Sequence, residues 1–181
     1  MVRPTALPEV LVVDPAVHGD ERGFFLETWH EERYAALGIA AHFVQDNHSR
    51  SVQGTLRGLH YQLQHPQGKL VRVASGEVFD VAVDLRRSSP TFGRWTAEVL
   101  SAANHRQLWI PPGFGHGFYV LSEMADLLYK CTEYYRAGDD RALRWDDPDV
   151  AIAWPLLPGR APLLSSRDAA APSLRTAPVY S

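Results

Sequence analysis

Three residues suited to proton chemistry lie close together between Arg57 and Lys69. Arg57 and Lys69 are cations, and His60 is an imidazole placed between them. A neutral imidazole can remove a proton from a carbon next to a carbonyl, and fixed cations stabilise the negative charge that develops. Arg57 and His60 are three residues apart, so a regular strand would point them to opposite faces. We expect Gly58 to mark a bulge that turns both side chains into one cavity.

The imidazole of His60 would need a carboxylate that orients it and stabilises its protonated form. Asp80, Asp84 and, much further along the chain, Asp168 are the candidates. No nucleophile elbow or serine motif is present, which favours proton transfer over acyl transfer. The choice among the three carboxylates stays open at this point.

A phenol is the candidate acid on the opposite side of the substrate. Tyr129 and Tyr135 share one face of the alternating segment Asp126–Tyr135, where they could line a pocket. A phenol titrates far above neutral pH, and we expect cations such as Lys69 to lower the pKa of Tyr129.

A metal centre is the competing interpretation of the histidines. The segment Pro111–His116 matches the second half of the metal-binding signature of cupin barrels. The first half would supply two more histidines and a carboxylate, but Gln62 stands at the second histidine position and Lys69 follows. Two histidines do not fill a metal shell, and a lysine would repel the cation. We therefore expect no metal, and His116 on its own remains compatible with a hydrogen-bonded core residue.

The elements that must position these residues are short strands, because glycine and proline, 13 of each, interrupt the chain every few residues. A single short helix is expected at 31–37. Strands at this spacing predict an antiparallel sandwich or barrel, and no βαβ alternation is present. After Trp154, we expect loops and turns that wrap the barrel. The predicted strands are 10–13, 23–27, 42–47, 55–62, 69–75, 78–85, 93–100, 107–110, 117–121 and 126–135.

One predicted strand, Val78–Leu85, has an apolar face and a face that carries Asp80 and Asp84. The acidic face could be solvated, or it could line a polar interior where a carboxylate pairs with Lys69 or a histidine. The sequence alone leaves both options open.

Size and charge limit the function further. The chain has 181 residues, a net charge of −3 and one cysteine, Cys131. It has no basic stripe and no apolar run long enough to span a membrane, so we expect neither nucleic acid nor a membrane as partner. A single cysteine fits the reducing cytoplasm, and no signal-peptide pattern opens the chain.

The chain closely resembles the dTDP-4-dehydrorhamnose 3,5-epimerase family over nearly its whole length. The ordered motifs that carry the resemblance are His18–Phe25, Phe43–Ser49, Leu56–Gln62, Gln67–Arg72, Gly76–Asp84, Gln107–Pro111, Gly113–Phe118, Leu128–Thr132 and Ser166–Ala170. The resemblance implies an all-β, cupin-like jelly-roll barrel of antiparallel strands with a few short helices. It implies one epimerase domain, 1–181, with the jelly-roll core at about 42–135, that forms a homodimer.

The resemblance also implies roles for residues. By position, His60 corresponds to the general base, Asp168 to its partner, Tyr129 to the acid, and Lys69 to a catalytic cation. Substrate-binding positions, some of which reach across the dimer, are Arg22, Glu27, Gln45, Asp46, Asn47, Arg57, His116, Asp140 and Arg167. Asp140 and Arg167 stand where the family often has glutamate and lysine.

The implied reaction inverts C3 and C5 of dTDP-4-dehydro-6-deoxy-D-glucose through an enolate next to the C4 ketone, giving dTDP-4-dehydro-L-rhamnose without a cofactor. The nearest rival is an epimerase that acts at one carbon, or on an amino-deoxy sugar of an antibiotic pathway. A metal-dependent cupin oxygenase or a non-catalytic sugar-nucleotide binding module fits the sequence less well.

Overall fold

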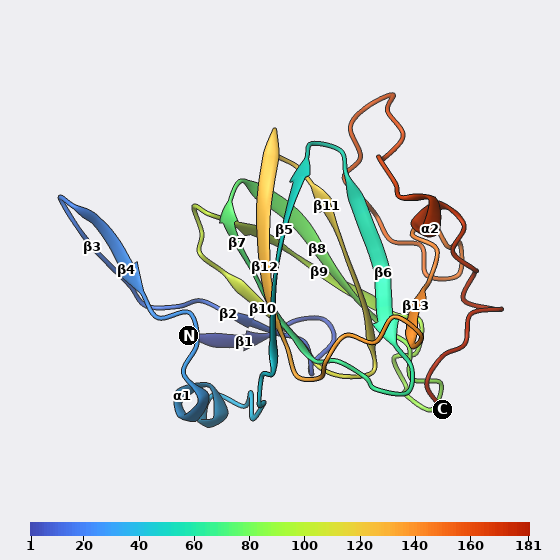
Figure 1. The fold of residues 1–181 in the computed structure, drawn as a ribbon, viewed down its shortest axis with the longest axis horizontal. Coiled ribbons are helices and arrows are strands. Elements are labelled where there is room, and N and C mark those ends of the chain that lie inside the picture. Colours follow the sequence, from blue (N-terminus) through green and yellow to red (C-terminus); the bar gives the residue numbers. More distant parts are fainter.

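The structure is a computed structural model that describes residues 1–181. Two sheets face each other, and a separate hairpin projects from them (Figure 1). The strands are β1 (Val2–Pro4), β2 (Leu11–Val13), β3 (Val17–Asp20), β4 (Gly23–Leu26), β5 (Gln45–Val52), β6 (Leu56–Gln62), β7 (Lys69–Ser75), β8 (Glu77–Asp84), β9 (Trp95–Ser101), β10 (Gln107–Ile110), β11 (Phe114–Val120), β12 (Met124–Cys131) and β13 (Asp140–Ala142). The helices are α1 (Glu31–Ala36) and α2 (Ser166–Ala169).

Pairing between strands is antiparallel throughout the two large sheets. The six-stranded sheet has the order β1-β2-β10-β7-β12-β5, and the five-stranded sheet has the order β13-β6-β11-β8-β9. Apolar side chains from their inner faces form the main core, in which Val71 and Leu127 of one sheet pack with Val78 and Phe118 of the other. Each fully buried side chain of this kind contributes about 1.5–3 kcal/mol. The predicted all-β, cupin-like fold class is confirmed.

The acidic face of β8 lies inside the sandwich. Asp80 and Asp84 are fully buried, while Val81 and Val83 pack on the other side of the strand in a second apolar cluster. Both faces of this strand are therefore covered, and the interpretation as a solvated outer face is wrong.

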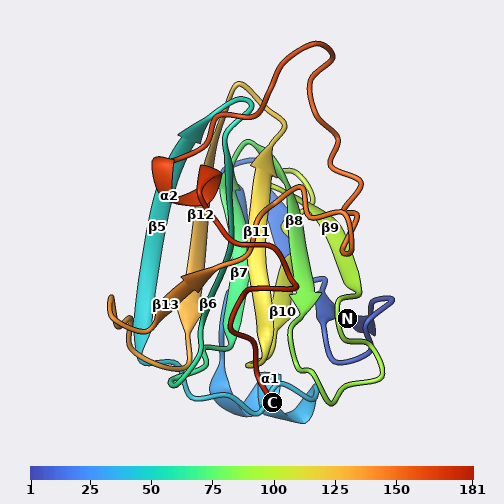
Figure 2. The ribbon, with the colours of Figure 1, turned by 90° about the vertical axis from the view of Figure 1, so that its right-hand side faces the viewer.

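The second apolar cluster is covered by the C-terminal segment. Residues after Trp154 cross the outside of the five-stranded sheet as loops, with α2 as one short helical turn (Figure 2). Two phenols attach this segment to β6: the Tyr61 hydroxyl donates to the Pro178 carbonyl and the Tyr180 hydroxyl donates to the Gln62 carbonyl, both at 2.6 Å. The predicted wrapping of the tail is confirmed.

Helix α1 covers one end of the six-stranded sheet on its outer face. His30 caps its first turn, and Tyr34 packs with Val13, Ile39 and Trp109 in a third apolar cluster. No helix in the chain combines the length and the apolar character needed to cross a bilayer.

Strand β5 was placed wrongly from the sequence. It was expected at 42–47 but begins at Gln45 and continues to Val52, fully paired with β12. Its charged residues are tolerated because they alternate with inward-facing ones, so Asp46, His48 and Arg50 lie on the exposed face.

Candidate active site

The candidate site is a cavity of about 300 Å³ between the two sheets. The inner faces of β5, β7 and β12 form one wall, and β6 and β13 form the other. Its lining is mostly polar and comprises Gln45, Asn47, His60, Gln67, Lys69, Tyr129, Tyr135 and Asp140. The apolar core fills the rest of the space between the sheets, so polar side chains gather where that core ends.

An imidazole–carboxylate pair joins β6 to α2. His60 Nε2 lies 2.6 Å from Asp168 Oδ1 across a separation of 108 residues. The Asp168 side chain is 3% exposed and that of His60 is 31% exposed. With Nε2 bound to the carboxylate, Nδ1 is the ring nitrogen left free to accept a proton. Of the three carboxylates considered from the sequence, Asp168 is the partner.

Asp168 is held in place by the cap of its own helix. Ser165 precedes α2, and its hydroxyl accepts a hydrogen bond from the Asp168 amide at 3.1 Å. Burial by itself would raise the pKa of Asp168, but the hydrogen bond with His60 and the positive charge it can acquire outweigh burial, so the pKa lies below its usual value. The carboxylate is thus ionised and ready to stabilise a protonated His60.

The bulge predicted at Gly58 is present. On β11, His116 pairs with His60 and Phe118 pairs with Arg57. The step between the two pairs is two residues on β11 but three on β6, so β6 holds one extra residue. Gly58 has φ +129° and is packed against the backbone of Gly117. As a result, Arg57 and His60 line one cavity of about 330 Å³, which also contacts Asp168.

Two cations flank His60. The Lys69 ammonium on β7 is buried and lies 3.5 Å from the His60 carbonyl oxygen. Burial lowers the pKa of Lys69, an effect opposed by the nearby Cys131, Asp140 and Asp80. The Arg57 guanidinium is anchored by a hydrogen bond of 3.0 Å to the Ser51 hydroxyl.

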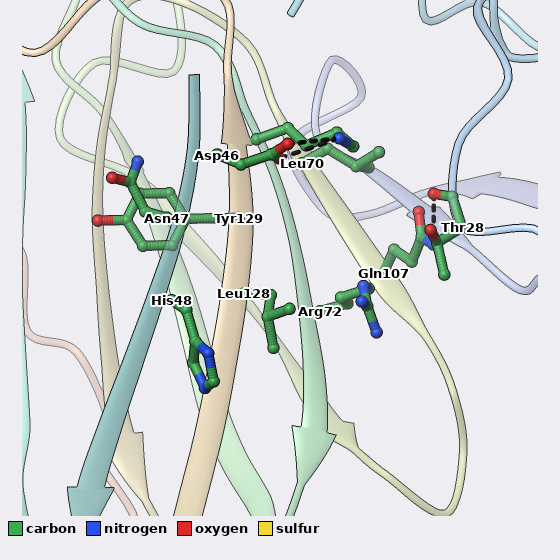
Figure 3. A pocket seen from close by; sticks show the side chains of 10 residues that line it. Thr28, Asp46, Asn47, His48, Leu70, Arg72, Gln107, Leu128 and Tyr129 are labelled. Atoms are coloured by element: carbon green, nitrogen blue, oxygen red, sulfur yellow. Dashed lines mark hydrogen bonds and ion pairs between the residues drawn. The ribbon is translucent and has the colours of Figure 1, made fainter. Parts of the chain in front are cut away.

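Tyr129 enters the cavity from the sheet that faces His60. Figure 3 shows its ring and the Asn47 amide on one side of β12, with Leu128 on the other side. Burial raises the pKa of Tyr129, the thiol of Cys131 adds to this, and Arg57 opposes it only in part. The expectation of a lowered pKa was wrong, because the cost of burying the phenolate exceeds the attraction of the cations.

A second imidazole–carboxylate pair lies in the interior. His116 Nε2 is 3.0 Å from both carboxylate oxygens of Asp80, and the two side chains are 7% and 0% exposed. Asp84 has a different partner, since Arg86 binds both of its oxygens. Asp80 and Asp84, considered as partners of His60, therefore serve other groups.

Polar side chains at the rim of the cavity bind one another. The Gln45 amide donates to Asn47 Oδ1 at 3.0 Å. Asp140 accepts a hydrogen bond from the Tyr135 hydroxyl at 3.1 Å and forms an ion pair with Arg167, the residue before Asp168. Four predicted binding residues thus lie beside the pair of His60 and Asp168. They are Gln45, Asn47, Asp140 and Arg167.

Three predicted binding residues lie away from this cavity within one chain. Arg22 is at the tip of the β3–β4 hairpin in an exposed pair with Asp20, and Glu27 pairs with Arg33 near α1. Asp46 points outward from β5 and pairs with Lys130. A neighbouring cavity of about 320 Å³ on that side of the six-stranded sheet contacts Asp46, Asn47 and Tyr129 (Figure 3).

No three or more side chains of His, Cys, Asp or Glu are gathered where they could hold a metal ion. His60 and His116, the two histidines of the cupin-like pattern, each bind a carboxylate through Nε2 instead.

The sequence did not reveal the supporting residues of the site. Ser51 anchors Arg57, Ser165 caps the turn that carries Asp168, and Asp80 binds His116. Alternation along β8 placed Asp80 and Asp84 on one face, but it left open whether that face points inward and which histidine a carboxylate would meet. Ser51 and Ser165 gave no signal, since a single serine before a short helix or within a strand is common.

These features define a cupin-like β-sandwich protein whose cavity is equipped for proton transfer. The family model described as dTDP-4-dehydrorhamnose 3,5-epimerase matches residues 4–176, and the chain belongs to that family.

Two relatives show how close the similarity is. The chain is 57% identical over 164 residues to the dTDP-4-dehydrorhamnose 3,5-epimerase of Pseudomonas aeruginosa, which covers 90% of each chain. It is also similar to the solved dTDP-6-deoxy-D-glucose-3,5-epimerase of Legionella pneumophila in complex with dTDP-4-keto-L-rhamnose, with a TM-score of 0.95, 52% identity and coverage of 100% of this chain and 98% of the other.

A third relative has a narrower activity. The solved 3'-monoepimerase of Streptomyces bikiniensis, in complex with dTDP-quinovose, is 33% identical with a TM-score of 0.88 and covers 96% of this chain and 88% of its own.

Proposed function

We propose that residues 1–181 form one epimerase domain that inverts C3 and C5 of dTDP-4-dehydro-6-deoxy-D-glucose, giving dTDP-4-dehydro-L-rhamnose. The observation that carries this proposal is the 2.6 Å pair of His60 and Asp168 in a cavity that Tyr129 enters from the facing sheet. The relationship to the Pseudomonas aeruginosa and Legionella pneumophila epimerases supports the choice of substrate.

His60 acts as the base. Its free Nδ1 takes the proton from C5 or C3, the C–H electron pair moves to form the enolate, and Asp168 stabilises the imidazolium. Tyr129 then donates its proton to the opposite face of the carbon, which inverts the centre. A pKa raised by burial keeps this phenol protonated at neutral pH, as a donor requires.

Lys69 and Arg57 stabilise the enolate oxygen. The Lys69 ammonium is buried, so its attraction for a developing negative charge is screened less than it would be in water. Preorganised charges of this kind change rates by about 10²–10³-fold. We place Gln45, Asn47, His116, Asp140 and Arg167 around the substrate.

The test is deuterium incorporation from heavy water into the substrate, followed by proton NMR. We expect His60→Ala to abolish exchange at both carbons, because His60 is the one histidine that lines the cavity, whereas His116 lies behind it as a buried partner of Asp80. His42→Ala is the matched control, since this histidine is exposed and pairs with Glu31 outside the site, and it should exchange normally. Normal exchange in His60→Ala would overturn the proposal.

A narrower reaction at one carbon is the second candidate, favoured by the similarity to the Streptomyces bikiniensis 3'-monoepimerase. The same spectra separate the two. Deuterium at both C3 and C5 supports the double epimerase, and deuterium at C3 alone supports the narrower activity.

We further propose that the protein works as a homodimer in the cytoplasm. The β3–β4 hairpin projects from the sandwich (Figure 1) and exposes Phe24 and Phe25 at 63% and 71%, which a second copy would cover. Arg22 at its tip and Glu27 at its base would then contact the substrate in the partner's cavity. The single buried Cys131 supports a reducing compartment.

A further inference from the structure

The segment between β12 and β13, residues 132–139, is irregular, yet it carries Tyr135 to the rim of the cavity. Asp140, which follows this segment, also lines the cavity and accepts a hydrogen bond from the Tyr135 hydroxyl at 3.1 Å. Backbone groups outside a strand need other partners if a segment is to keep one conformation. Side chains must therefore supply here the hydrogen bonds that a neighbouring strand supplies elsewhere.

One buried amide group binds the backbone on both sides of Tyr135. It belongs to Gln62, the last residue of β6, which is 1% exposed. Its Nε2 donates to the carbonyl oxygens of His65 at 2.8 Å and Tyr134 at 3.1 Å, and its Oε1 accepts from the Arg136 amide. Two carbonyl oxygens on one side and an N–H group on the other determine which way this amide points.

A second amide group binds Tyr135 itself. Gln45 Oε1 accepts a hydrogen bond from the Tyr135 backbone N–H at 2.8 Å. Gln45 lines the cavity, where we place the substrate, whereas Gln62 is buried and does not line it. A change at Gln62 therefore alters the support of Tyr135 without removing a group that faces the substrate.

The residue type at position 62 suits the attachment of a loop. Gln62 shares a face of β6 with His60, because side chains two residues apart on a strand point the same way. It stands where the cupin metal signature has its second histidine. An imidazole has only two ring nitrogens and could not make these three hydrogen bonds, two donated and one accepted, whereas a primary amide can.

We propose that Gln62 is a positioning residue, which fixes the backbone around Tyr135 so that the Tyr135 ring stays in place as a wall of the cavity beside the bound sugar. The catalytic consequence of this role rests on the proposed epimerase function. A protein whose binding-competent form is populated only in part binds its substrate more weakly by that fraction. Loss of the Gln62 amide should therefore weaken substrate binding more than it slows proton transfer.

The first test needs neither substrate nor variant. Amide hydrogen exchange of the wild-type protein, followed by NMR, reports whether the Arg136 N–H is protected. We expect its protection factor to be at least tenfold above that of Gly138, whose amide in the same segment donates no hydrogen bond. An Arg136 amide as unprotected as that of Gly138 would overturn the proposal, whatever the protein does to any sugar.

The second test replaces the amide group by an apolar one of similar size. In Gln62→Met we expect the protection of Arg136 to fall at least tenfold and KM to rise about tenfold, with a smaller change in kcat. Deuterium incorporation at C3 and C5 should continue, since His60 and Asp168 keep their contact. Unchanged protection or an unchanged KM would remove the positioning role. A wild-type protein that incorporates no deuterium would refute the proposed function, whereas the protection of Arg136 decides the structural part by itself.

A carboxyl group at position 62 tests the donated hydrogen bond by titration. Protonated, it can donate to the Tyr134 carbonyl and accept from the Arg136 amide; ionised, it has no donor and faces two carbonyl oxygens. Burial raises the pKa of such a group, so lowering the pH protonates it. The KM of Gln62→Glu relative to the wild type should therefore fall as the pH is lowered from 8 to 6, whereas that of Gln62→Met should stay constant. A Gln62→Glu ratio as high at pH 6 as that of Gln62→Met would contradict the proposal.

Ser122→Ala is the matched control. The Ser122 hydroxyl also binds backbone groups of a turn, accepting from the Glu77 amide at 2.8 Å and donating to the Met124 carbonyl at 2.7 Å. This turn precedes β12, whereas the segment that carries Tyr135 follows it. The variant should lose stability while KM stays as in the wild type. An equal rise of KM in this variant and in Gln62→Met would show that general loosening of the sandwich, and not the Gln62 contact, is responsible.

Discussion

Lys69 shows at the scale of a single residue how a site can oppose the stability of the fold. Its ammonium is buried, and its only hydrogen bond is a long one to the His60 carbonyl oxygen. Asp80 and Asp140 attract it, but burial dominates and lowers its pKa. The same lack of water strengthens its attraction for an enolate. The charge that we propose to stabilise the enolate is therefore unfavourable in the resting protein.

We predict that Lys69→Met is more stable than the wild type at pH 7 and at least 100-fold less active. A lysine whose folded pKa is lowered binds fewer protons in the native state than in the unfolded state between the two pKa values. The free energy of unfolding of the wild type therefore rises with pH towards about 10.4, the ordinary lysine value. The advantage of the variant should shrink over that range.

Urea unfolding at pH 7 and pH 10 measures this difference. Lys130→Met is the control, because the Lys130 ammonium pairs with the exposed Asp46 at the surface. It should not gain stability at pH 7. A Lys69→Met protein that is less stable than the wild type at pH 7 would contradict the prediction.

At the scale of elements, the bulged pairing of β6 with β11 determines the geometry of the site. The bulge at Gly58 brings Arg57 and His60 to one cavity and sets His60 opposite His116. A side chain at position 58 would place its Cβ 2.5 Å from Gly117 Cα and 2.8 Å from the His116 carbonyl oxygen. Both contacts are with backbone, which cannot move aside without shifting the second histidine.

We predict that Gly58→Ala loses about 3 kcal/mol of unfolding free energy and most of its activity, because both the positive φ and the backbone contacts oppose a methyl group. Thermal unfolding and the deuterium exchange assay measure the two effects. Gly138→Ala is the control, since no atom lies within 4 Å of its added Cβ. Equal stability of the two variants would show that the bulge at position 58 tolerates a side chain.

Elements with strong local signals could be predicted from the sequence. The strands Lys69–Ser75 and Gln107–Ile110 were predicted with their observed bounds, because they are β-branched or aromatic runs between turns. Strand β13 and helix α2 were missed. They have three and four residues, too few for a sequence pattern, and tertiary contacts place them: β13 pairs with β6, and Asp168 of α2 binds His60.

The site was partly predictable for a similar reason. A histidine, a lysine and an arginine close together in sequence indicated proton chemistry without any coordinates. The partner of His60 could not be chosen among Asp80, Asp84 and Asp168, because pairing across sheets depends on tertiary packing. The sign of the pKa change of Tyr129 was also out of reach, since it depends on how deeply the phenol is buried.

At the scale of the whole molecule, the β3–β4 hairpin is the part that lacks a partner within one chain. We predict that Phe25→Ser lowers self-association at least tenfold, because this side chain is 71% exposed and contributes little to the fold of one copy. Sedimentation velocity over a concentration series measures the change. The unfolding midpoint of the separated protomer should stay within the range of ordinary surface substitutions.

Leu163→Ser is the control for that experiment. Leu163 is also exposed, at 54%, but it lies on the C-terminal segment beside Thr55, away from the hairpin. It should leave self-association unchanged. Equal sedimentation of wild type and Phe25→Ser would show that the hairpin does not hold two copies together.

The distance of 108 residues between His60 and Asp168 has a consequence for biosynthesis. When β13, the last strand, leaves the ribosome, both sheets have all their strands, yet His60 has no carboxylate partner. Only when the turn around Asp168 emerges does His60 gain the carboxylate that the proposed mechanism requires. On the proposed mechanism, a chain that ends after β13 would hold every strand but would lack the pair of His60 and Asp168, so activity would arise only near the end of translation.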